Sequence, residues 1–148
     1  MKFIADVMLG RLAKRLRLLG YDVLYDPSLD DNGLIRLSLE EHRLMLTRDK
    51  ALAARPLASN HLFINSELVD EQVEQVRSIS PGDAAPLTRC SVCNEPLASI
   101  PRQEARDLVP PYVFENREVF FRCTACGRIY WKGTHVRRMT EWTGEKKT

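Results

Sequence analysis

The chain has 148 residues, of which 44% are hydrophobic and 28% are charged, and its net charge is +2. This is the composition of a globular protein, and the length suits one ordinary domain or a small domain joined to a metal-stapled module. No apolar stretch approaches the roughly 18 residues of a membrane span, and Asp6 interrupts the apolar N-terminus before a signal segment can form. We therefore expect a cytoplasmic protein without a membrane partner.

Short apolar strands alternate with helical patterns in the first half of the chain. The clearest helix follows the first strand, because leucines recur there at helical spacing and Gly20 comes directly after the last of them. This alternation predicts an α/β fold with a parallel sheet flanked by helices, and the right-handed crossovers place the carboxyl ends of the strands at one common edge. Strands are predicted at residues 2–5, 22–25, 43–47 and 61–65, and helices at 9–19, from 30 to about 42, at 51–54 and from a Ser66 cap to 76.

All four cysteines lie in two C-x-x-C motifs, Cys90 with Cys93 and Cys123 with Cys126. Two residues between the sulfurs allow one tight turn to present both thiolates to a metal, and two such turns complete the tetrahedral coordination of one structural Zn²⁺ ion. Two disulfides or a redox dithiol are the alternatives, but a cytoplasmic chain keeps its thiols reduced, and a redox site needs one motif only. The 29 residues between the motifs predict an ordered excursion.

The chain divides at a segment rich in proline, glycine and alanine. In the second half, an apolar strand over 118–122 leads into the second cysteine motif, and residues 128–131 are predicted to form the return strand of a hairpin. Gly127 suits the turn between them, since glycine tolerates a positive φ. We expect a sheet domain over 1–80, a linker over 81–88, a zinc ribbon over 89–142 and a polar tail over 143–148.

Aspartates stand where the predicted strands end. Asp6 closes the first strand and Asp49 follows the third, while Asp30 and Asp31 begin the second helix. Ligands of open α/β sheets bind outside the carboxyl ends of the strands, and clustered carboxylates there suit Mg²⁺ or Mn²⁺, which offsets their repulsion. Each aspartate can instead cap a helix or close a turn, and Asp30 suits either role. Arg48, beside Asp49, can pair with carboxylates or hold a phosphate.

Basic residues are concentrated on the first helix and toward the C-terminus, where residues 128–147 carry six basic and two acidic side chains. This distribution suits a nucleic-acid ligand, although a solvated surface produces the same pattern. Tyr130 and Trp131 are available either for base stacking or for the core of the ribbon. Arg17 shares with the candidates Arg11, Lys14 and Arg15 the face opposite the leucines, and the C-terminal candidates for RNA contact are Arg128, Lys132, His135, Arg137 and Arg138.

Three segments carry a family resemblance: DVMLGRLAKRLRLLGYD at 6–22, LTRD at 46–49 and CTACGRIYWKGTHVRRM at 123–139. Together they resemble the Mut7-C family over essentially the whole chain. Members of this family are similar to PIN-like nucleases joined to a zinc ribbon, and the family is regarded as an RNase family. The resemblance implies a PIN-like α/β fold and metal-dependent hydrolysis of phosphodiester bonds.

Carried over to this chain, the resemblance assigns Asp6 and Asp49 as the strand-end acids and Asp31, with Asp30 as the alternate, as the acid at the start of the second helix. The fourth acid of a full PIN-like site has no clear counterpart. The closing motif around His135 is expected to contact RNA or to pack against the nuclease domain.

The leading hypothesis is an RNA endonuclease in which Asp6, Asp31 and Asp49 hold Mg²⁺ or Mn²⁺ and the zinc ribbon helps to bind single-stranded or structured RNA. One alternative is a non-catalytic RNA-binding adaptor with structural carboxylates. Another is a toxin-like PIN protein controlled by a protein partner, which rests on analogy of fold. The motifs of P-loop NTPases, dinucleotide-binding enzymes and serine hydrolases do not occur in the sequence.

Overall fold

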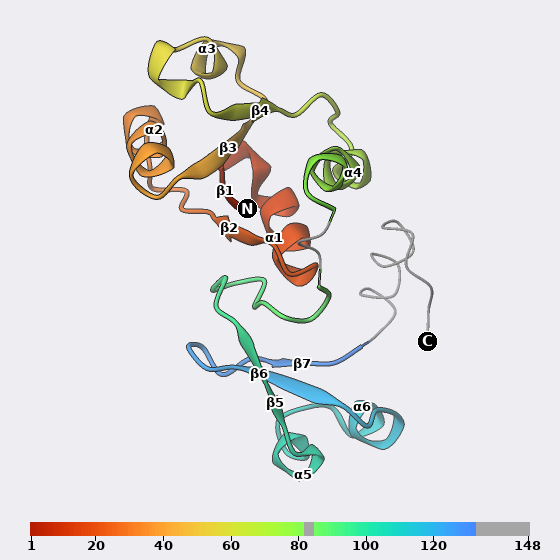
Figure 1. Ribbon diagram of the computed structural model, residues 1–148. Helices are drawn as coiled ribbons and strands as arrows, with labels where there is room; N and C mark the ends of the chain where they lie inside the picture. The colour runs from red at the N-terminus through yellow and green to blue at the C-terminus, as the bar shows by residue number, and fades with distance from the viewer. Residues whose placement is uncertain (82–84, 133–148) are drawn as a thin grey trace.

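The computed structural model describes residues 1–81 and 85–132, which form two parts of an elongated molecule (Figure 1). The first part, which we call the α/β unit, contains four strands with helices packed around them. The strands are β1 (Lys2–Ala5), β2 (Asp22–Leu24), β3 (Arg43–Thr47) and β4 (His61–Phe63); the 3₁₀ helices are η1 (Val7–Leu9) and η2 (Pro56–Ala58); the α-helices are α1 (Gly10–Leu18), α2 (Asp31–Glu40), α3 (Lys50–Ala53) and α4 (Val69–Ile79).

The sheet of the α/β unit is parallel, with the strand order β2-β1-β3-β4. Helices α1 and α4 cover one face, where Phe3 and Leu46 contribute to a buried cluster. Helices α2 and α3 cover the other face, where Ile4 and Met45 are buried. The central strands are therefore buried on both sides, which explains why they are continuous apolar runs. The predicted α/β fold with a parallel sheet flanked by helices is confirmed (Figure 1).

One helix boundary follows the prediction and another does not. Helix α1 buries its leucines, including Leu16, and ends before Gly20, whose φ is +96°. Helix α4 begins at Val69 with Leu68 as its N-cap residue, so the predicted Ser66 cap is wrong. The Ser66 hydroxyl instead accepts the Leu68 N–H at 3.0 Å, and it closes a turn in the loop before the helix.

Side chains cover both edges of the parallel sheet. At β2, the Val23 N–H donates to Asn94 Oδ1 at 3.1 Å, and the Val23 carbonyl accepts from Arg17 Nε at 2.8 Å. At β4, the Gln75 amide donates to the Phe63 carbonyl at 2.7 Å and accepts the backbone N–H two residues later at 2.9 Å. These bonds satisfy outward backbone groups that a sheet edge otherwise leaves open.

Residues 89–132 form the second part, which we call the cysteine unit. Its antiparallel sheet has the order β5-β6-β7, and Ala105 and Phe120 are fully buried in a core of its own. The excursion between the cysteine motifs is ordered, the hairpin of β6 and β7 is present, and Gly127 has a φ of +79°, all as predicted. The elements are β5 (Leu97–Ile100), α5 (Arg102–Ala105), α6 (Pro111–Asn116), β6 (Phe120–Cys123) and β7 (Ile129–Tyr130).

The two units are joined at the C-terminal end of α1. The Ala85 N–H donates to the Leu19 carbonyl at 2.6 Å and so satisfies one of the carbonyls that a helix end leaves without a partner. A side chain at Gly20 would clash with the Ala85 carbonyl oxygen, so this approach requires glycine. Arg17 Nη1 donates to the carbonyls of Ser91 and Val92 at 3.1 Å each. Part of the segment predicted as a linker is therefore packed against the α/β unit.

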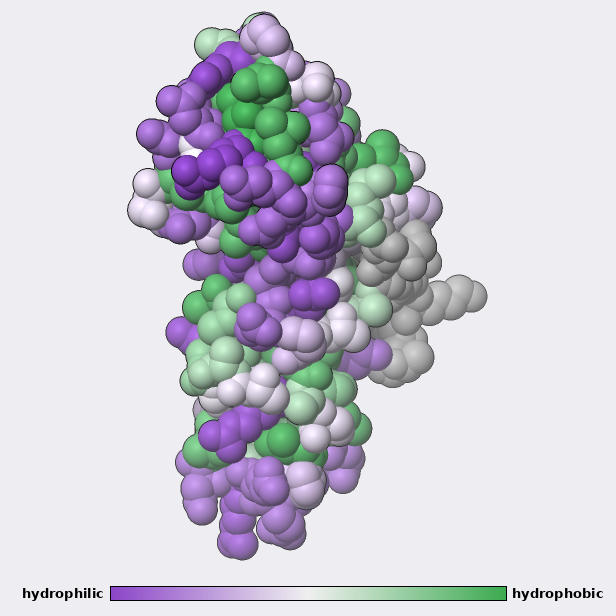
Figure 2. All heavy atoms as spheres, turned by 60° about the vertical axis from the view of Figure 1, so that its left-hand side comes forward, coloured by the Kyte–Doolittle hydropathy of each residue, from purple (hydrophilic) through white to green (hydrophobic). Residues whose placement is uncertain are grey.

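The surface is mainly hydrophilic on the face shown in Figure 2, with separate apolar patches over both units. No helix of the described residues combines the length and the hydrophobicity needed to cross a membrane. The predicted polar tail over 143–148 and the end of the predicted ribbon, 133–142, lie outside the described residues.

Candidate functional site

The two central strands bring Asp6 and Asp49 to the same edge of the sheet. Strands β1 and β3 are parallel neighbours, with Ala5 opposite Leu46, which confirms the predicted adjacency. Asp6 follows β1 directly, is 5% exposed, and donates its N–H to the Leu46 carbonyl at 3.0 Å. The order of the strands reverses between β1 and β3, and this is the position at which open α/β sheets form ligand-binding crevices.

Thr47, the last residue of β3, connects the two aspartates. Its hydroxyl donates to Asp6 Oδ2 at 3.0 Å and accepts the Asp49 N–H at 2.9 Å. The residue is fully buried, so the hydroxyl is used as both donor and acceptor away from solvent. Thr47 lies in the LTRD segment at 46–49, but it was not predicted as a site residue. Its other signal is its place at the end of an apolar strand, two residues before a candidate acid.

We call the edge of the sheet that carries Asp6, Asp31 and Asp49 the acidic edge. Its other side is formed by the N-termini of α2 and α3. Asp49 caps α3, because its Oδ1 accepts the N–H groups two and three residues later at 2.9 and 3.1 Å. Asp30 caps α2 by accepting the Gly33 N–H at 2.8 Å. Asp31 follows in the first turn of α2 and is exposed. Asp49 Oδ2 accepts no hydrogen bond from a described residue, so it remains available to a ligand.

The carboxylates at this edge converge less closely than the sulfurs of the cysteine unit. Within residues 1–81 and 85–132, no three carboxylates bring their oxygens within 4.8 Å of one another, as the four sulfurs do. Asp6, Asp31 and Asp49 thus share an edge without forming a preassembled cage. The oxygen donors fit Mg²⁺ or Mn²⁺ in type, and Mg²⁺ is commonly held by one or two carboxylates together with water and substrate phosphate.

Arg48, a predicted catalytic residue, and Arg15, a predicted RNA contact, are both engaged by their own chain. Arg48 Nη1 donates to the Ile64 carbonyl at 2.9 Å, and Arg15 pairs with Asp70 at 3.0 Å. Arg17, which was expected on a solvated helix face, is only 5% exposed because the cysteine unit covers it. Of the remaining candidates, Arg11, Lys14, Arg128 and Lys132 are exposed, whereas His135, Arg137 and Arg138 lie outside the described residues.

Tyr25 holds the loop that follows Asp6. Its hydroxyl donates to the Val7 carbonyl at 2.7 Å. Its ring lies against Gly10, where a Cβ atom would come within 2.9 Å of the Tyr25 hydroxyl oxygen. The segment between β1 and α1 is therefore supported by the residue that follows β2. Tyr25 was not predicted as part of the site, and its one signal in the sequence is Gly10, the glycine in the first turn of the helix.

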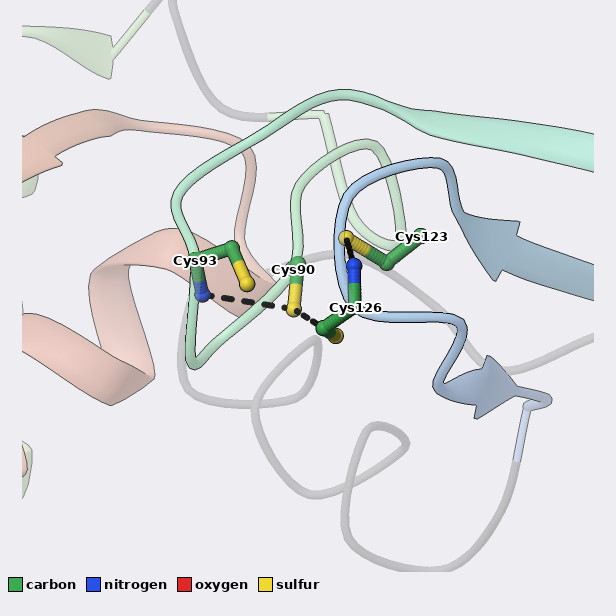
Figure 3. Close-up of side chains that lie close together, drawn as sticks. All are labelled: Cys90, Cys93, Cys123 and Cys126. Atoms are coloured by element: carbon green, nitrogen blue, oxygen red, sulfur yellow. Dashed lines mark hydrogen bonds between the residues drawn. The ribbon is translucent and has the colours of Figure 1, made fainter.

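The four cysteine sulfurs form a compact cluster (Figure 3). All four lie within 4.8 Å of one another, and the sulfurs of Cys90 and Cys126 are 3.8 Å apart. A tetrahedral Zn²⁺ ion with bonds of about 2.3 Å requires sulfur separations of about 3.8 Å, so the spacing fits this ion. All four thiols are free, which excludes the alternative of two disulfides in this structure.

The two C-x-x-C turns have the same backbone design. Asn94 and Gly127 come directly after them with φ of 65° and 79°, and each donates its N–H to the carbonyl of the first cysteine at 2.9 Å. In each turn the N–H of the second cysteine also approaches the sulfur of the first, at 3.4 and 3.5 Å. Such N–H groups stabilise the negative charge that a sulfur needs in order to bind a metal.

The thiols differ in their tendency to ionise. Burial opposes ionisation of Cys90, but hydrogen bonds from the Tyr130 hydroxyl and from backbone N–H groups outweigh it and lower its pKa to about 7. The pKa of Cys93 is raised to about 12 by its hydrogen bond with Cys126, by burial and by the charge of Cys90. Sulfurs this close cannot all be negative unless a cation balances them, so the cluster suits a divalent metal.

Comparison with known families gives a match that covers nearly the whole chain. The model of the Mut7-C RNAse domain family matches residues 1–143. The chain belongs to the Mut7-C RNAse domain family. Membership gives this Mut7-C protein a ribonuclease-like function at the level of the family, with RNA as the class of substrate, and its cysteine cluster fits zinc binding. No curated protein and no solved structure matches the chain.

Proposed function

We propose that this Mut7-C protein is a PIN-like, metal-dependent RNA endonuclease with its active site at the carboxyl edge of the parallel sheet. The main support is the pair of Asp6 and Asp49 at the reversal point between β1 and β3, linked through the Thr47 hydroxyl. Asp31, at the start of α2, is proposed as the third acid, with Asp30 as its alternate. Family membership supports RNA as the substrate.

Asp6 and Asp49 would hold Mg²⁺ or Mn²⁺, which supplies an activated water and balances the charge that builds up on the phosphodiester. The chain itself orients the two carboxylates. Thr47 holds Asp6 Oδ2, and the N-terminus of α3 holds Asp49 Oδ1. One oxygen of each carboxylate is thereby directed by the protein, and the other accepts no hydrogen bond from a described residue.

The cysteine unit is proposed to hold one structural Zn²⁺ ion and to aid RNA binding. Arg17 and Asn94 fix its first turn to α1 and β2, so its exposed cations, Arg128 and Lys132, keep a defined position relative to the acidic edge. Exposed Arg11 adds a cation on α1, the helix that follows Asp6. Phosphate contacts of this kind position RNA independently of its sequence.

The test is cleavage of labelled RNA by zinc-loaded protein with added Mn²⁺, with added Mg²⁺ and with neither. No chelator is used, because it would also remove zinc. Asp6→Asn and Asp49→Asn are compared with Asp107→Asn, which changes an exposed aspartate of the cysteine unit. We expect metal-dependent cleavage by the wild type and by Asp107→Asn, and a loss of at least about 100-fold in the two edge variants.

The outcomes separate the candidate functions. Cleavage that persists in both edge variants would refute the proposed active site. RNA binding without cleavage under any of the metal conditions would refute the nuclease and support the RNA-binding adaptor.

A further inference from the structure

A cavity in the cysteine unit lies apart from the acidic edge. It has a volume of about 310 Å³, at the lower end of the range found for small-ligand sites. Its walls come from the first cysteine turn, the segment after α5, and β7 with the residues beside it. Among the described residues, two aromatic side chains, one cation and no acidic side chain line it. The lining residues are Ser91, Leu108, Arg128, Ile129, Tyr130 and Trp131.

Contacts hold both aromatic side chains in place. The Tyr130 hydroxyl oxygen accepts the Ser91 N–H at 3.1 Å and lies 3.0 Å from Cys90 Sγ. Trp131 packs edge-on against Phe120, with 6.5 Å between the ring centroids. Both rings remain half-exposed. Aromatic rings that are already fixed lose little conformational freedom when a ligand binds.

The cation at the cavity is available to a ligand. Arg128 is exposed, and its guanidinium makes no hydrogen bond or ion pair with another described residue. Arg102 of the same unit behaves differently, because it stacks on Phe114 at 3.8 Å and donates to the Arg117 carbonyl. A guanidinium without a described partner beside aromatic rings, with no acid among the described lining residues, favours a ligand that is flat, aromatic and negatively charged.

We propose that this cavity binds one unstacked base of single-stranded RNA, with Trp131 as the stacking surface and Arg128 contacting a neighbouring phosphate. The proposal rests on the proposed function, because RNA as the ligand comes from family membership. Aromatic side chains stack on any base, and a guanidinium binds phosphate through charge-assisted hydrogen bonds. An uncharged apolar peptide would fill the cavity without needing Arg128.

The position of the cavity narrows the class of substrate. Ser91 lines it, and the Ser91 carbonyl also accepts from Arg17 of α1, so a bound base is fixed relative to the α/β unit. A base can enter only if it is unpaired and unstacked. The preferred substrate is therefore RNA with a single-stranded segment that reaches both the cavity and the acidic edge.

Tryptophan fluorescence tests the proposal directly. The chain has two tryptophans, so Trp142→Phe leaves Trp131 as the one indole. This zinc-loaded variant is titrated with single-stranded RNA of about 12 nucleotides at fixed ionic strength. Mg²⁺ and Mn²⁺ are omitted so that cleavage does not interfere. An abasic oligonucleotide of the same length supplies the same phosphates. We expect RNA to quench Trp131 and the abasic strand to bind more weakly without quenching.

Substitutions at the cavity supply a second measurement. Trp131→Leu keeps an apolar side chain against Phe120 and should weaken RNA binding by about 5- to 150-fold. Arg128→Gln should weaken RNA binding. It should also reduce the slope of log affinity against log salt concentration by about the amount of one phosphate contact. Arg36→Gln removes the same charge from an exposed position on α2 and is the matched control, for which we expect a smaller effect. Unfolding midpoints show whether each variant is folded, and the fluorescence titration does not depend on Trp131→Leu.

The results can refute the proposed base-binding cavity without refuting the proposed nuclease function. Equal affinity for RNA and for the abasic strand, unchanged Trp131 fluorescence, or wild-type affinity in a folded Trp131→Leu variant would overturn it. Equal losses of RNA affinity in Arg128→Gln and Arg36→Gln would show that Arg128 does not contribute a specific phosphate contact at the cavity. RNA cleavage without any response of Trp131 would leave the proposed function intact. Base-dependent quenching without cleavage would support the cavity and refute the nuclease.

Discussion

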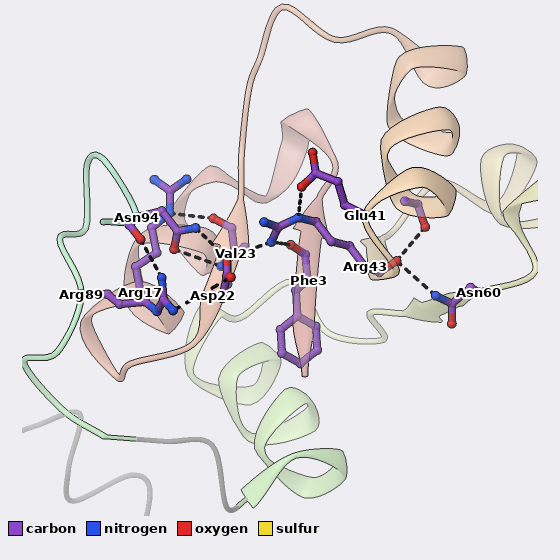
Figure 4. A network of polar contacts seen from close by, with 10 residues as sticks. Phe3, Arg17, Asp22, Val23, Glu41, Arg43, Asn60, Arg89 and Asn94 are labelled. Atoms are coloured by element: carbon purple, nitrogen blue, oxygen red, sulfur yellow. Dashed lines mark hydrogen bonds and ion pairs between the residues drawn. The ribbon is translucent and has the colours of Figure 1, made fainter. Parts of the chain in front are cut away.

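Asn94 combines two properties that a glycine substitution separates. Its backbone has a φ of +65°, which glycine adopts more readily. Its side chain accepts the Val23 N–H at 3.1 Å and donates to Asp22 Oδ1 at 2.7 Å, which joins the cysteine unit to β2 (Figure 4). Asn94→Gly keeps the turn and removes both bonds. The second cysteine turn has Gly127 at the equivalent position, so the metal site does not require asparagine.

The expected change follows from the groups that lose their partners. Val23 is fully buried, and its N–H would be left unpaired, which costs about 1–3 kcal/mol. Asp22 keeps its bond with Arg43 at 2.8 Å, so the loss there is about 1 kcal/mol at most. Relief of the positive φ offsets about 1 kcal/mol, because asparagine already tolerates this conformation better than most residues. The terms sum to a net loss of between about 0 and 3 kcal/mol, which should lower the melting temperature by up to about 10 °C.

Urea unfolding of the zinc-loaded protein measures this loss, with far-UV circular dichroism reporting the helices and tryptophan fluorescence reporting the cysteine unit. His42→Gly is the matched control. His42 also has a positive φ, 55°, but it is exposed and its side chain makes no hydrogen bond with a described residue. We expect His42→Gly to be neutral or slightly stabilising, whereas Asn94→Gly should be destabilising.

The sign therefore decides the matter. If Asn94→Gly unfolded at a higher urea concentration than the wild type, the amide would not join the two units and the reasoning would be refuted. Zinc content is measured in each variant, so that a change in stability is not mistaken for a loss of metal.

Three further predictions concern the aspartates and the metal. Thr47→Val should destabilise the chain by about 1–3 kcal/mol and lower RNA cleavage, whereas Thr47→Ser should retain most of both; equal activity in the two variants would contradict the role of the hydroxyl. Burial raises the pKa of Asp22, but hydrogen bonds from Arg43 and Asn94 outweigh it and hold the pKa below its usual value. The stabilising effect of ionised Asp22 is therefore complete above about pH 4 and is lost as the pH falls through its lower pKa in the folded state. In Asp22→Asn, the free energy of unfolding measured in urea should therefore decrease less steeply with falling pH than in the wild type. Removal of zinc should lower the melting temperature of the helices of both units, because Arg17 connects α1 to the first cysteine turn; an unchanged transition of the α/β unit would show that the units fold independently.

The elements that depend on local periodicity could be predicted from the sequence. Helix α1 is buried along one face, which produces its leucine spacing. Strands β1 and β3 are buried on both faces, which produces their continuous apolar runs. The boundary of α4 could not be predicted in this way, because a serine hydroxyl that closes a turn and one that caps a helix have the same sequence signature. Ser66 does the former.

Within the candidate site, Asp6 and Asp49 could be predicted because they stand at strand ends. The hydroxyl group that links them could not be predicted. Threonine is common in strands, so the place of Thr47 at the end of β3 did not predict that its hydroxyl links the two acids. Arg17 was misplaced because helical periodicity considers one helix alone. Its partners Ser91 and Val92 are 74 and 75 residues away in the chain, and their contact buries a face that would otherwise be solvated.

The two covered edges of the sheet also affect how one molecule meets another. A strand from a second chain could pair with β2 only by displacing Asn94 and Arg17, and with β4 only by displacing Gln75, so β-type aggregation is obstructed on both sides. The two barriers differ in origin. Gln75 and Arg17 belong to helices of the same unit, but Asn94 belongs to the first cysteine turn, whose sulfur cluster fits a metal ion. Loss of a metal from this cluster would then weaken the cover of the β2 edge, where Arg17 would remain, and would leave the β4 edge unchanged.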